Sequence, residues 1–317
     1  MAAPSNTITT YNTVGVREDL EDVIYRVAAE ETPFVSNIGT AKAYQTYHEW
    51  QEETLATPSA TNAALEGNSF SIAAGNTPTR VGNYCQIFTK AYGVSRTDEV
   101  VRKAGRVSEL NRQKVLKGLE ARRDVEMRLV GNYASNAESG STPRFSAGAL
   151  AWLVSNTSVG AGGSNGGFAS GTVSTATNGT QRNFSEALVK GVMSACFQAG
   201  GKPTQAYMGP TSKQEFSAFT GIADIRKDAK ADKMATIIGA ADVYVSDFGN
   251  LTLIPHAYAL SRDCLIIDPK MWAMGVLDGW KSVELAQTSD STQYALTYEC
   301  CLVARNEKAS GAVRDIQ

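Results

Sequence analysis

The hydrophobic residues of the first thirty positions follow a helical period, and the pattern then stops. One face of the predicted helix carries apolar residues at helical spacing: Val16, Leu20, Val23, Ile24 and Val27. This spacing predicts a helix over residues 16–29, after an extended arm over residues 1–15. Pro33 disfavours helical geometry at Thr32, so we expect the helix to end there or just before.

The next forty residues, 40–80, are rich in Thr, Ala, Asn and Glu and show almost no apolar periodicity. Their aromatic residues predict a hairpin whose first strand holds Tyr44, Tyr47 and Trp50. Its second strand would hold Phe70. A solvated two-stranded hairpin is only marginally stable alone, so this one needs another surface to lie on.

Alternation returns at Tyr84 and predicts a strand as far as Val94, followed by a long helix over about residues 107–137. The helix has no proline, one tolerated glycine (Gly118) and many strong helix formers. At about 1.5 Å per residue it would span roughly 45 Å. Such a length is typical of a backbone on which sheets pack.

Small and polar residues dominate positions 139–180, where we expect short strands or a wrap over the surface. A compact α/β module follows over residues 183–268. Asn183 is the candidate N-cap of its first helix, and a capping box starting at Thr211 predicts a second helix. Two of its strands are predicted to join at a turn, Gly249-Asn250.

The last strong pattern is a long antiparallel pair, Trp272 to Ala286 and Gln293 to Val303. Together these elements predict an α+β protein. The 317 residues suffice for one large or two modest domains, and ordinary hydrophobic content excludes disorder throughout. No apolar run reaches the roughly 18 residues that span a bilayer, and no signal peptide is recognisable.

The residues that most often carry chemistry occur in no catalytic or metal-binding pattern. The five cysteines, an odd number without a C-x-x-C pair, indicate reduced and mostly buried thiols in a cytosolic protein. They are Cys85, Cys196, Cys264, Cys300 and Cys301. Neither His48 nor His256 has a second ligand at zinc spacing, and we expect a structural role for His256. The glycine cluster 160–167 lacks the lysine and the helix of a phosphate cradle. The sequence therefore predicts no catalytic residue, cofactor or metal.

Three carboxylates, Glu49, Glu52 and Glu53, lie close to Trp50 in the sequence. A glycosidase pair needs a cleft that sets the spacing of its carboxylates. The polar, alanine-rich surroundings favour an acidic contact face instead. A carboxylate-dependent hydrolase using Glu49 and Glu52 is kept as the alternative from another functional class.

The long helix and the residues before it are basic. The positive residues are Arg102, Lys103, Arg106, Arg112, Lys114, Lys117, Arg122, Arg123 and Arg128. A solvated face and non-specific contact with phosphates are two interpretations. We favour a third, in which they pair with acidic residues of a neighbouring subunit. The candidate inter-subunit contact residues are Tyr44, Tyr47, Trp50, Glu52, Glu53, Phe70, Arg112, Arg122 and Arg123.

Six short motifs occur in order over nearly the whole chain. They are Glu31-Thr32-Pro33-Phe34, Lys103-Ala104-Gly105-Arg106, Gly160-Ala161-Gly162-Gly163, Gly179-Thr180-Gln181-Arg182, Val245-Ser246-Asp247-Phe248-Gly249 and Ala304-Arg305-Asn306-Glu307-Lys308-Ala309. In this order the chain resembles the major capsid proteins of tailed bacteriophages, in particular a coat-protein family of podoviruses and siphoviruses. Ser310 departs from the last motif, where the resemblance leads us to expect histidine.

The resemblance implies the Hong Kong 97-like capsid fold, with an N-terminal arm, an extended β-hairpin loop, a peripheral domain with a spine helix, and an axial α/β domain. The implied segments, in chain order, are 1–39 (arm and short helix), 40–82 (extended loop), 83–150 (peripheral domain, spine helix 107–137), 151–267 (Gly/Ser-rich segment and axial domain), 268–306 (long strand pair) and 307–317 (C-terminal tail). The apolar side chains of residues 40–80 would then find partners only in the assembled shell.

The function implied by the resemblance is that of a coat protein, found in the virion and, during assembly, in the host cytoplasm. It would assemble as hexamers and pentamers into an icosahedral head and contact packaged double-stranded DNA non-specifically. Because the sequence starts directly at the arm, a separate scaffolding protein is expected, with a portal and a decoration protein as further partners. A shell protein of a cellular nanocompartment with the same fold is the alternative.

Overall fold

The computed structural model describes residues 28–29, 31–67, 69, 75–105, 107–219, 243–287 and 289–317. The predicted arm, most of the predicted helix over residues 16–29 and the candidate contact residue Phe70 lie outside these ranges. Among the described residues, no helix is both long enough and apolar enough to cross a membrane.

A short helix missed by the sequence patterns begins where the first predicted helix was expected to end. Thr32 is non-helical as expected, with φ −124° and ψ 70°, but Pro33 opens helix α1 (Pro33–Asn37). Proline suits the first helical position because its φ is preset and the missing N–H has no helical partner there. The same residue therefore disfavours one helix and starts another.

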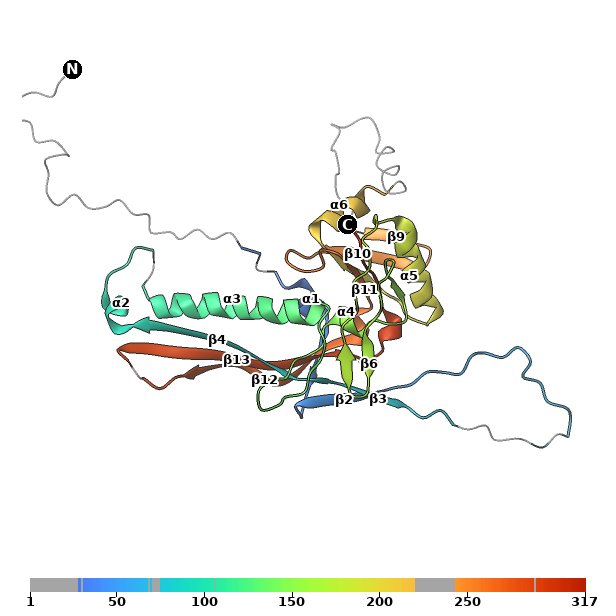
Figure 1. The fold of residues 1–317 in the computed structure, drawn as a ribbon, viewed down its shortest axis with the longest axis horizontal. Helices are drawn as coiled ribbons and strands as arrows, with labels where there is room; N and C mark the ends of the chain where they lie inside the picture. The colour runs from blue at the N-terminus through green and yellow to red at the C-terminus, as the bar shows by residue number, and fades with distance from the viewer. Residues whose placement is uncertain are drawn as a thin grey trace, which may run out of the picture.

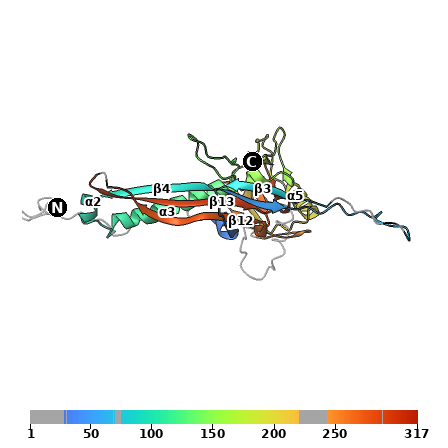
Figure 2. The same ribbon diagram turned by 90° about the horizontal axis from the view of Figure 1, so that it is seen from below.

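A four-stranded sheet in the order β1-β12-β13-β4 forms one end of the elongated molecule (Figure 1). Its strands are β1 (Gly39–Lys42), β4 (Gln86–Ser95), β12 (Trp272–Glu284) and β13 (Ser291–Ala304). β12 and β13 run antiparallel, which confirms the predicted long strand pair. Seen from below, the sheet and the helix beside it make a narrow body (Figure 2).

The long helix α3 (Glu109–Val130) runs along this sheet, beyond the short helix α2 (Arg96–Val100) (Figure 1). Its 22 residues span about 33 Å, so the predicted helix over residues 107–137 was too long. Gly131 ends it in an extended conformation. Beyond it, the Asn132 side chain exchanges two hydrogen bonds with the Ala176 backbone, at 2.8 and 2.9 Å, which draws the chain away from the helix axis.

A six-stranded mixed sheet in the order β5-β14-β11-β8-β10-β9 forms the second body. Its strands are β5 (Thr157–Ser158), β8 (Gln205–Met208), β9 (Val243–Ser246), β10 (Gly249–Pro255), β11 (Cys264–Ile267) and β14 (Gly311–Val313). The helices with this sheet are α5 (Glu186–Gln198) and α6 (Pro210–Ser217). The predicted tail over residues 307–317 is thus wrong, because β14 is a buried inner strand between β5 and β11.

In this second body the predicted helices and turn are present, but each begins a few residues away from the predicted position. Ser185, rather than Asn183, precedes α5, and α6 begins at Pro210, so the predicted capping box at Thr211 does not form. The turn between β9 and β10 is at Asp247-Phe248, because Ser246 pairs with Gly249.

Two small hairpins and several single turns complete the described chain. Strands β2 (Tyr47–Glu52) and β3 (Thr79–Tyr84) pair antiparallel, so the second strand of the predicted hairpin is not around Phe70. Tyr44 precedes the first strand rather than lying in it. The remaining elements are β6 (Gly167–Ala169), β7 (Thr172–Ser174), α4 (Ala149–Trp152) and two 3₁₀ turns, Pro269–Met271 and Glu307–Ala309.

One continuous core joins the two bodies. It holds Phe34 of α1, Leu129 of α3, Trp152 of α4, Leu265 of β11 and Trp272 of β12, all almost fully buried. A second cluster lies within the six-stranded body, between α5, α6 and the sheet. The shared core gives the subunit a rigid frame from which the β2–β3 hairpin projects (Figure 1).

Candidate assembly surfaces

The base of the β2–β3 hairpin packs on its own chain. The Trp50 ring lies 5.4 Å from the Trp152 ring, centroid to centroid. The Tyr47 hydroxyl donates a hydrogen bond of 3.0 Å to the Gly171 carbonyl, and its ring lies 4.6 Å from Tyr84. The expectation that apolar side chains of residues 40–80 find partners only in the assembled shell is therefore wrong for Trp50.

The outer part of the hairpin is different. Residues 53–67 and 75–78 contain no strand and are exposed at every described position (Figure 1). Leu55 and Leu65 are 94% and 83% exposed. Two leucines on a projecting loop gain nothing from the isolated subunit, which makes this segment a candidate contact surface.

The carboxylates near Trp50 do not form a catalytic pair. Glu49 forms an ion pair of 3.1 Å with Arg80 at the surface. Glu52, three residues further along the same strand, is on the opposite face, since side chains alternate along a strand. Burial raises the pKa of the Glu52 carboxyl. Glu53 is exposed beyond the strand. These positions provide no cleft with two facing carboxylates.

The basic residues of α3 are used in different ways. Arg112 pairs with Glu109 at 2.6 Å, within its own helix. The Arg123 guanidinium lies 5.2 Å from the centroid of the Tyr258 ring. Arg122 is exposed, at the mouth of a small cavity of 160 Å³ that Trp280 also lines. Of the three predicted contact arginines, Arg122 is thus the most available to a neighbour.

A buried carboxylate on α3 joins three distant parts of the chain. Glu126 accepts backbone N–H bonds from Phe34 and Val35, at 2.7 and 2.8 Å. His256 Nε2 lies 3.1 Å from the same carboxylate, and its Nδ1 accepts the Ala259 N–H. Nε2 therefore carries the proton and donates it to Glu126. His256 is fully buried, in agreement with the structural role expected for it. These bonds fix where the N-terminal part of the chain meets the frame.

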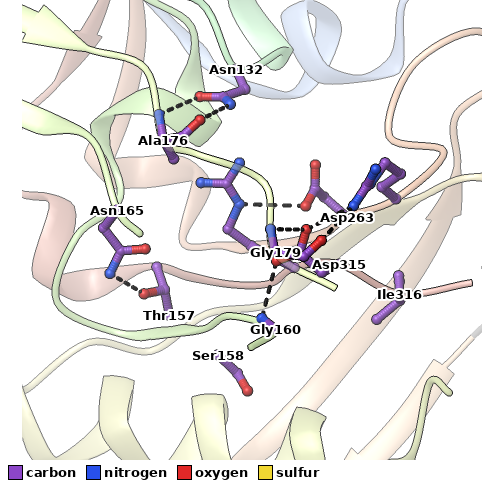
Figure 3. Close-up of polar contacts among 12 residues, drawn as sticks. Asn132, Thr157, Ser158, Gly160, Asn165, Ala176, Gly179, Asp263, Asp315 and Ile316 are labelled. Carbon is purple, nitrogen blue, oxygen red and sulfur yellow. Dashed lines mark hydrogen bonds and ion pairs between the residues drawn. The ribbon is translucent and has the colours of Figure 1, made fainter. Parts of the chain in front are cut away.

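A second polar cluster fixes the glycine-rich segment to the C-terminal residues (Figure 3). The buried Asp315 carboxylate accepts backbone N–H bonds from Gly160 and Gly179, at 3.0 and 2.9 Å. Arg262 donates to the same group at 3.1 Å. Asp315 has φ +57°, a left-handed conformation that aspartate adopts more readily than most residues. The glycine motifs noted in the sequence are thus anchor points for Asp315.

Two apolar surfaces were not predicted from the sequence. On the six-stranded sheet, the edge strand β9 exposes Val243 and Val245, beside the neighbouring rings of Phe197 and Phe248. At the far end of α3, a group of valines is exposed: Val100, Val101, Val107 and Val115. Alternation of Val243-Tyr244-Val245 signalled the strand, but only the sheet order shows that it is an edge. Exposed edges of this kind need a cover to avoid indiscriminate pairing.

The profile of the family described as "SU10 major capsid protein" matches residues 3–317. The major capsid protein of Escherichia phage Phieco32 is 32% identical over 124 residues. That match covers 39% of this chain and only 35% of the Phieco32 protein.

Solved capsid structures share the fold at low sequence identity. A chain from Cyanophage A-1(L) capsid has a TM-score of 0.67 at 10% identity, over 97% of this chain and 98% of its own. A chain from Gordonia phage Cozz has a TM-score of 0.64 at 10% identity, over 99% and 97%. The capsid of a native GTA particle gives 0.62 at 12% identity, over 97% and 98%. The predicted Hong Kong 97-like phage capsid fold is therefore confirmed.

Proposed function

Because the chain belongs to the SU10 major capsid protein family, we propose that it builds a phage head from hexamers and pentamers around double-stranded DNA. The family consists of structural proteins, so the chain is not an enzyme and the hydrolase alternative is wrong. In this proposal the four-stranded sheet with α3 is the peripheral domain, and the six-stranded sheet is the axial domain.

The observation that carries this proposal is the projecting hairpin on a rigid subunit. Leu55 and Leu65 are almost fully exposed, on a segment whose described residues are all exposed. Hydrophobic burial between copies would stabilise an assembly by about 25 cal/mol for each Å² removed from water. If the loop of one copy lies over its neighbours, these leucine side chains are removed from water and stabilise the contact.

Charge adds a second component to the proposed contact. The exposed Glu53 lies at the root of the loop, and Arg122 is exposed on α3. A contact between the loop of one copy and α3 of the next would bring opposite charges together, which favours one docking orientation. Tyr44 is also exposed, but it precedes the opposite end of β2, so it would belong to a separate contact. Tyr47, Trp50, Glu52, Arg112 and Arg123 belong more to the support of the surface than to the surface itself.

Electron microscopy of the purified protein tests the proposal. We expect closed shells or capsomers with five-fold and six-fold symmetry when the protein is expressed with the assembly factors of its own phage. A protein that stays a small oligomer under those conditions would contradict it.

Nuclease treatment separates the phage head from the nanocompartment alternative. Native particles of a phage head should protect double-stranded DNA of a defined length. Particles that hold folded protein cargo and no DNA would favour the nanocompartment. Scaffolding, portal and decoration proteins remain proposed partners, and mass spectrometry of assembly intermediates identifies them.

A further inference from the structure

Cys85 occupies the corner at which the hairpin leaves the four-stranded sheet. It is the single residue between β3 and β4. Tyr84 before it pairs with β2, whereas Gln86 after it pairs with Cys300 of β13. The N–H of Cys85 itself donates to the Thr46 carbonyl at 2.7 Å. One extended segment thus exchanges sheet partners at this residue.

Cys301 lies opposite this corner. The register that pairs Cys300 with Gln86 places Cys301 against Cys85 one step further along. Both side chains are buried in one small cluster with Ala43, Ala273 and Val303. The Cys85 thiol donates a hydrogen bond of 3.6 Å to the Gln45 carbonyl, and Cys301 is its neighbour in the cluster. Cys300, by contrast, lies in the core on the other face of the sheet.

A glycine on the neighbouring strand leaves room for the Cys301 sulfur. Gly275 of β12 pairs with Cys301, and a Cβ at Gly275 would lie 2.9 Å from the Cys301 Sγ. Any larger residue there would push this sulfur aside. The absent side chain therefore lets Cys301 keep its place beside Cys85.

The two thiols of this pair differ in acidity. A hydrogen bond from Cys301 to the thiolate lowers the pKa of Cys85 despite burial, and the positive charge of Arg144 acts in the same direction. That same hydrogen bond and burial raise the pKa of Cys301. Burial raises the pKa of Cys196 to about 12 and also raises those of Cys264 and Cys300. Since the thiolate is the nucleophile, the lowered pKa favours Cys85 as the attacking thiol of the pair.

We propose that Cys85 and Cys301 form a peroxide-sensitive dithiol that closes to a disulfide and fixes the hairpin to the sheet. The Cys85 thiolate attacks one oxygen of hydrogen peroxide, the O–O bond breaks, and hydroxide leaves and is protonated to water. The Cys301 sulfur then attacks the Cys85 sulfenic sulfur. The S–O bond breaks, and the departing hydroxide takes the Cys301 proton as water. In total two thiols and one peroxide give one disulfide and two waters.

The position of the pair explains both access and effect. Both sulfurs are buried, so in this proposal hydrogen peroxide reaches them through local opening of the corner. A bond from the corner to β13 would restrict the angle at which the hairpin leaves the sheet. This chemistry resides within one subunit, so it does not rest on the proposed function.

Peptide mapping tests the proposal directly. The full-length protein is treated with graded hydrogen peroxide, alkylated under denaturing conditions, digested without reductant and analysed by mass spectrometry. We expect a linked pair of peptides containing Cys85 and Cys301, with Cys85 oxidised at least tenfold faster than Cys300. The variant Cys300→Ser, one residue away on the opposite face, should form the same link, whereas Cys301→Ser should stop at an oxidised Cys85.

Hydrogen exchange provides the second readout and needs no variant. Backbone exchange around residues 81–87 should slow several-fold in oxidised wild type and return to its original rate after reduction. The proposal is overturned if both thiols stay free at peroxide concentrations that oxidise the urea-unfolded protein. It is equally overturned if Cys85 links to Cys300, or if the Cys85–Cys301 link forms without slowing exchange at the corner.

Discussion

The base and the outer part of the projecting hairpin differ in what supports them. At the base, Trp50 packs against Trp152, and Tyr47 reaches Gly171, more than one hundred residues away in the chain. In the outer part, Leu55 and Leu65 meet only solvent. Both parts have similar polar sequences. The difference shows that packing on the same chain extends into the loop as far as Glu52, so the proposed contacts with other copies would begin beyond it.

Removal of the outer part should have the largest effect, and it should affect assembly alone. Replacing residues 54–77 by a two-residue Asn-Gly turn would join the two strands directly. We expect the subunit to stay folded, with a melting temperature within about 2 °C of wild type, because every described residue of this segment is exposed. Shell formation, followed by electron microscopy, should be abolished.

A loop of equal length built from Gly and Ser is the matched control for this deletion. It keeps the reach of the loop and removes its side chains, so it separates the two contributions. If the deletion variant unfolds, the outer part belongs to the core of the subunit and the comparison fails.

The substitution Trp50→Ala should have the next largest effect, on the subunit itself. Truncating a large aromatic that packs on Trp152 removes core contacts and leaves a cavity. We expect the free energy of unfolding to fall by about 2–3 kcal/mol, since Trp50 is only partly buried. Urea denaturation of the unassembled subunit measures this. Trp50→Phe should recover part of the lost free energy of unfolding. If Trp50→Ala leaves the stability unchanged, Trp50 does not support the fold of its own chain and resembles the exposed outer part of the hairpin.

The double substitution of Leu55 and Leu65 by Ser should act in the opposite sense. Both side chains are exposed, so the free energy of unfolding should change by less than about 0.5 kcal/mol. Loss of two apolar contacts between copies should weaken assembly by about 1–2 kcal/mol per contact. Light scattering at several protein concentrations measures the critical concentration. An unchanged critical concentration would remove these leucines from the proposed interface.

The smallest expected effect concerns the pH dependence of the base. Burial raises the pKa of Glu52 above its ordinary value of 4.5, so the folded state holds this proton more tightly than the unfolded state. The free energy of unfolding should therefore fall as pH rises from 4.5 through the raised pKa. Glu52→Gln should remove this contribution of Glu52 to the pH dependence of unfolding. The variant should be more stable than wild type at neutral pH. Denaturation curves across this range, with the exposed Glu53→Gln as control, measure the difference.

Much of the fold was predictable because it depends on local periodicity. The long strand pair β12–β13 follows directly from the apolar pattern of its residues. The cysteines were predicted to be mostly buried, and all five are. Some errors concerned whole elements, such as the second strand of the hairpin, and others concerned element ends, where single contacts decide. The helix α3 stops at Gly131 because the Asn132 side chain binds the Ala176 backbone, a partner far along the chain.

The candidate surface was only partly predictable, because exposure depends on what packs from elsewhere. An aromatic residue in a polar stretch suggests a contact, yet nothing near Trp50 in the sequence tells whether the partner is Trp152 or another subunit. The sequence pattern also did not show that Val243 and Val245 of β9 would be exposed, because that depends on which face of the sheet other elements cover.

By itself the sequence determined the order of the elements, the absence of a recognisable catalytic pattern and the resemblance to capsid subunits, because these follow from local composition and spacing. Only the tertiary structure decided which residues pack against their own chain and which remain exposed. Glu126, Trp50 and Asp315 acquire their roles from partners more than ninety residues away in the chain. Such contacts form when the chain closes on itself, since the free energy of burial depends on neighbours in space and not in sequence.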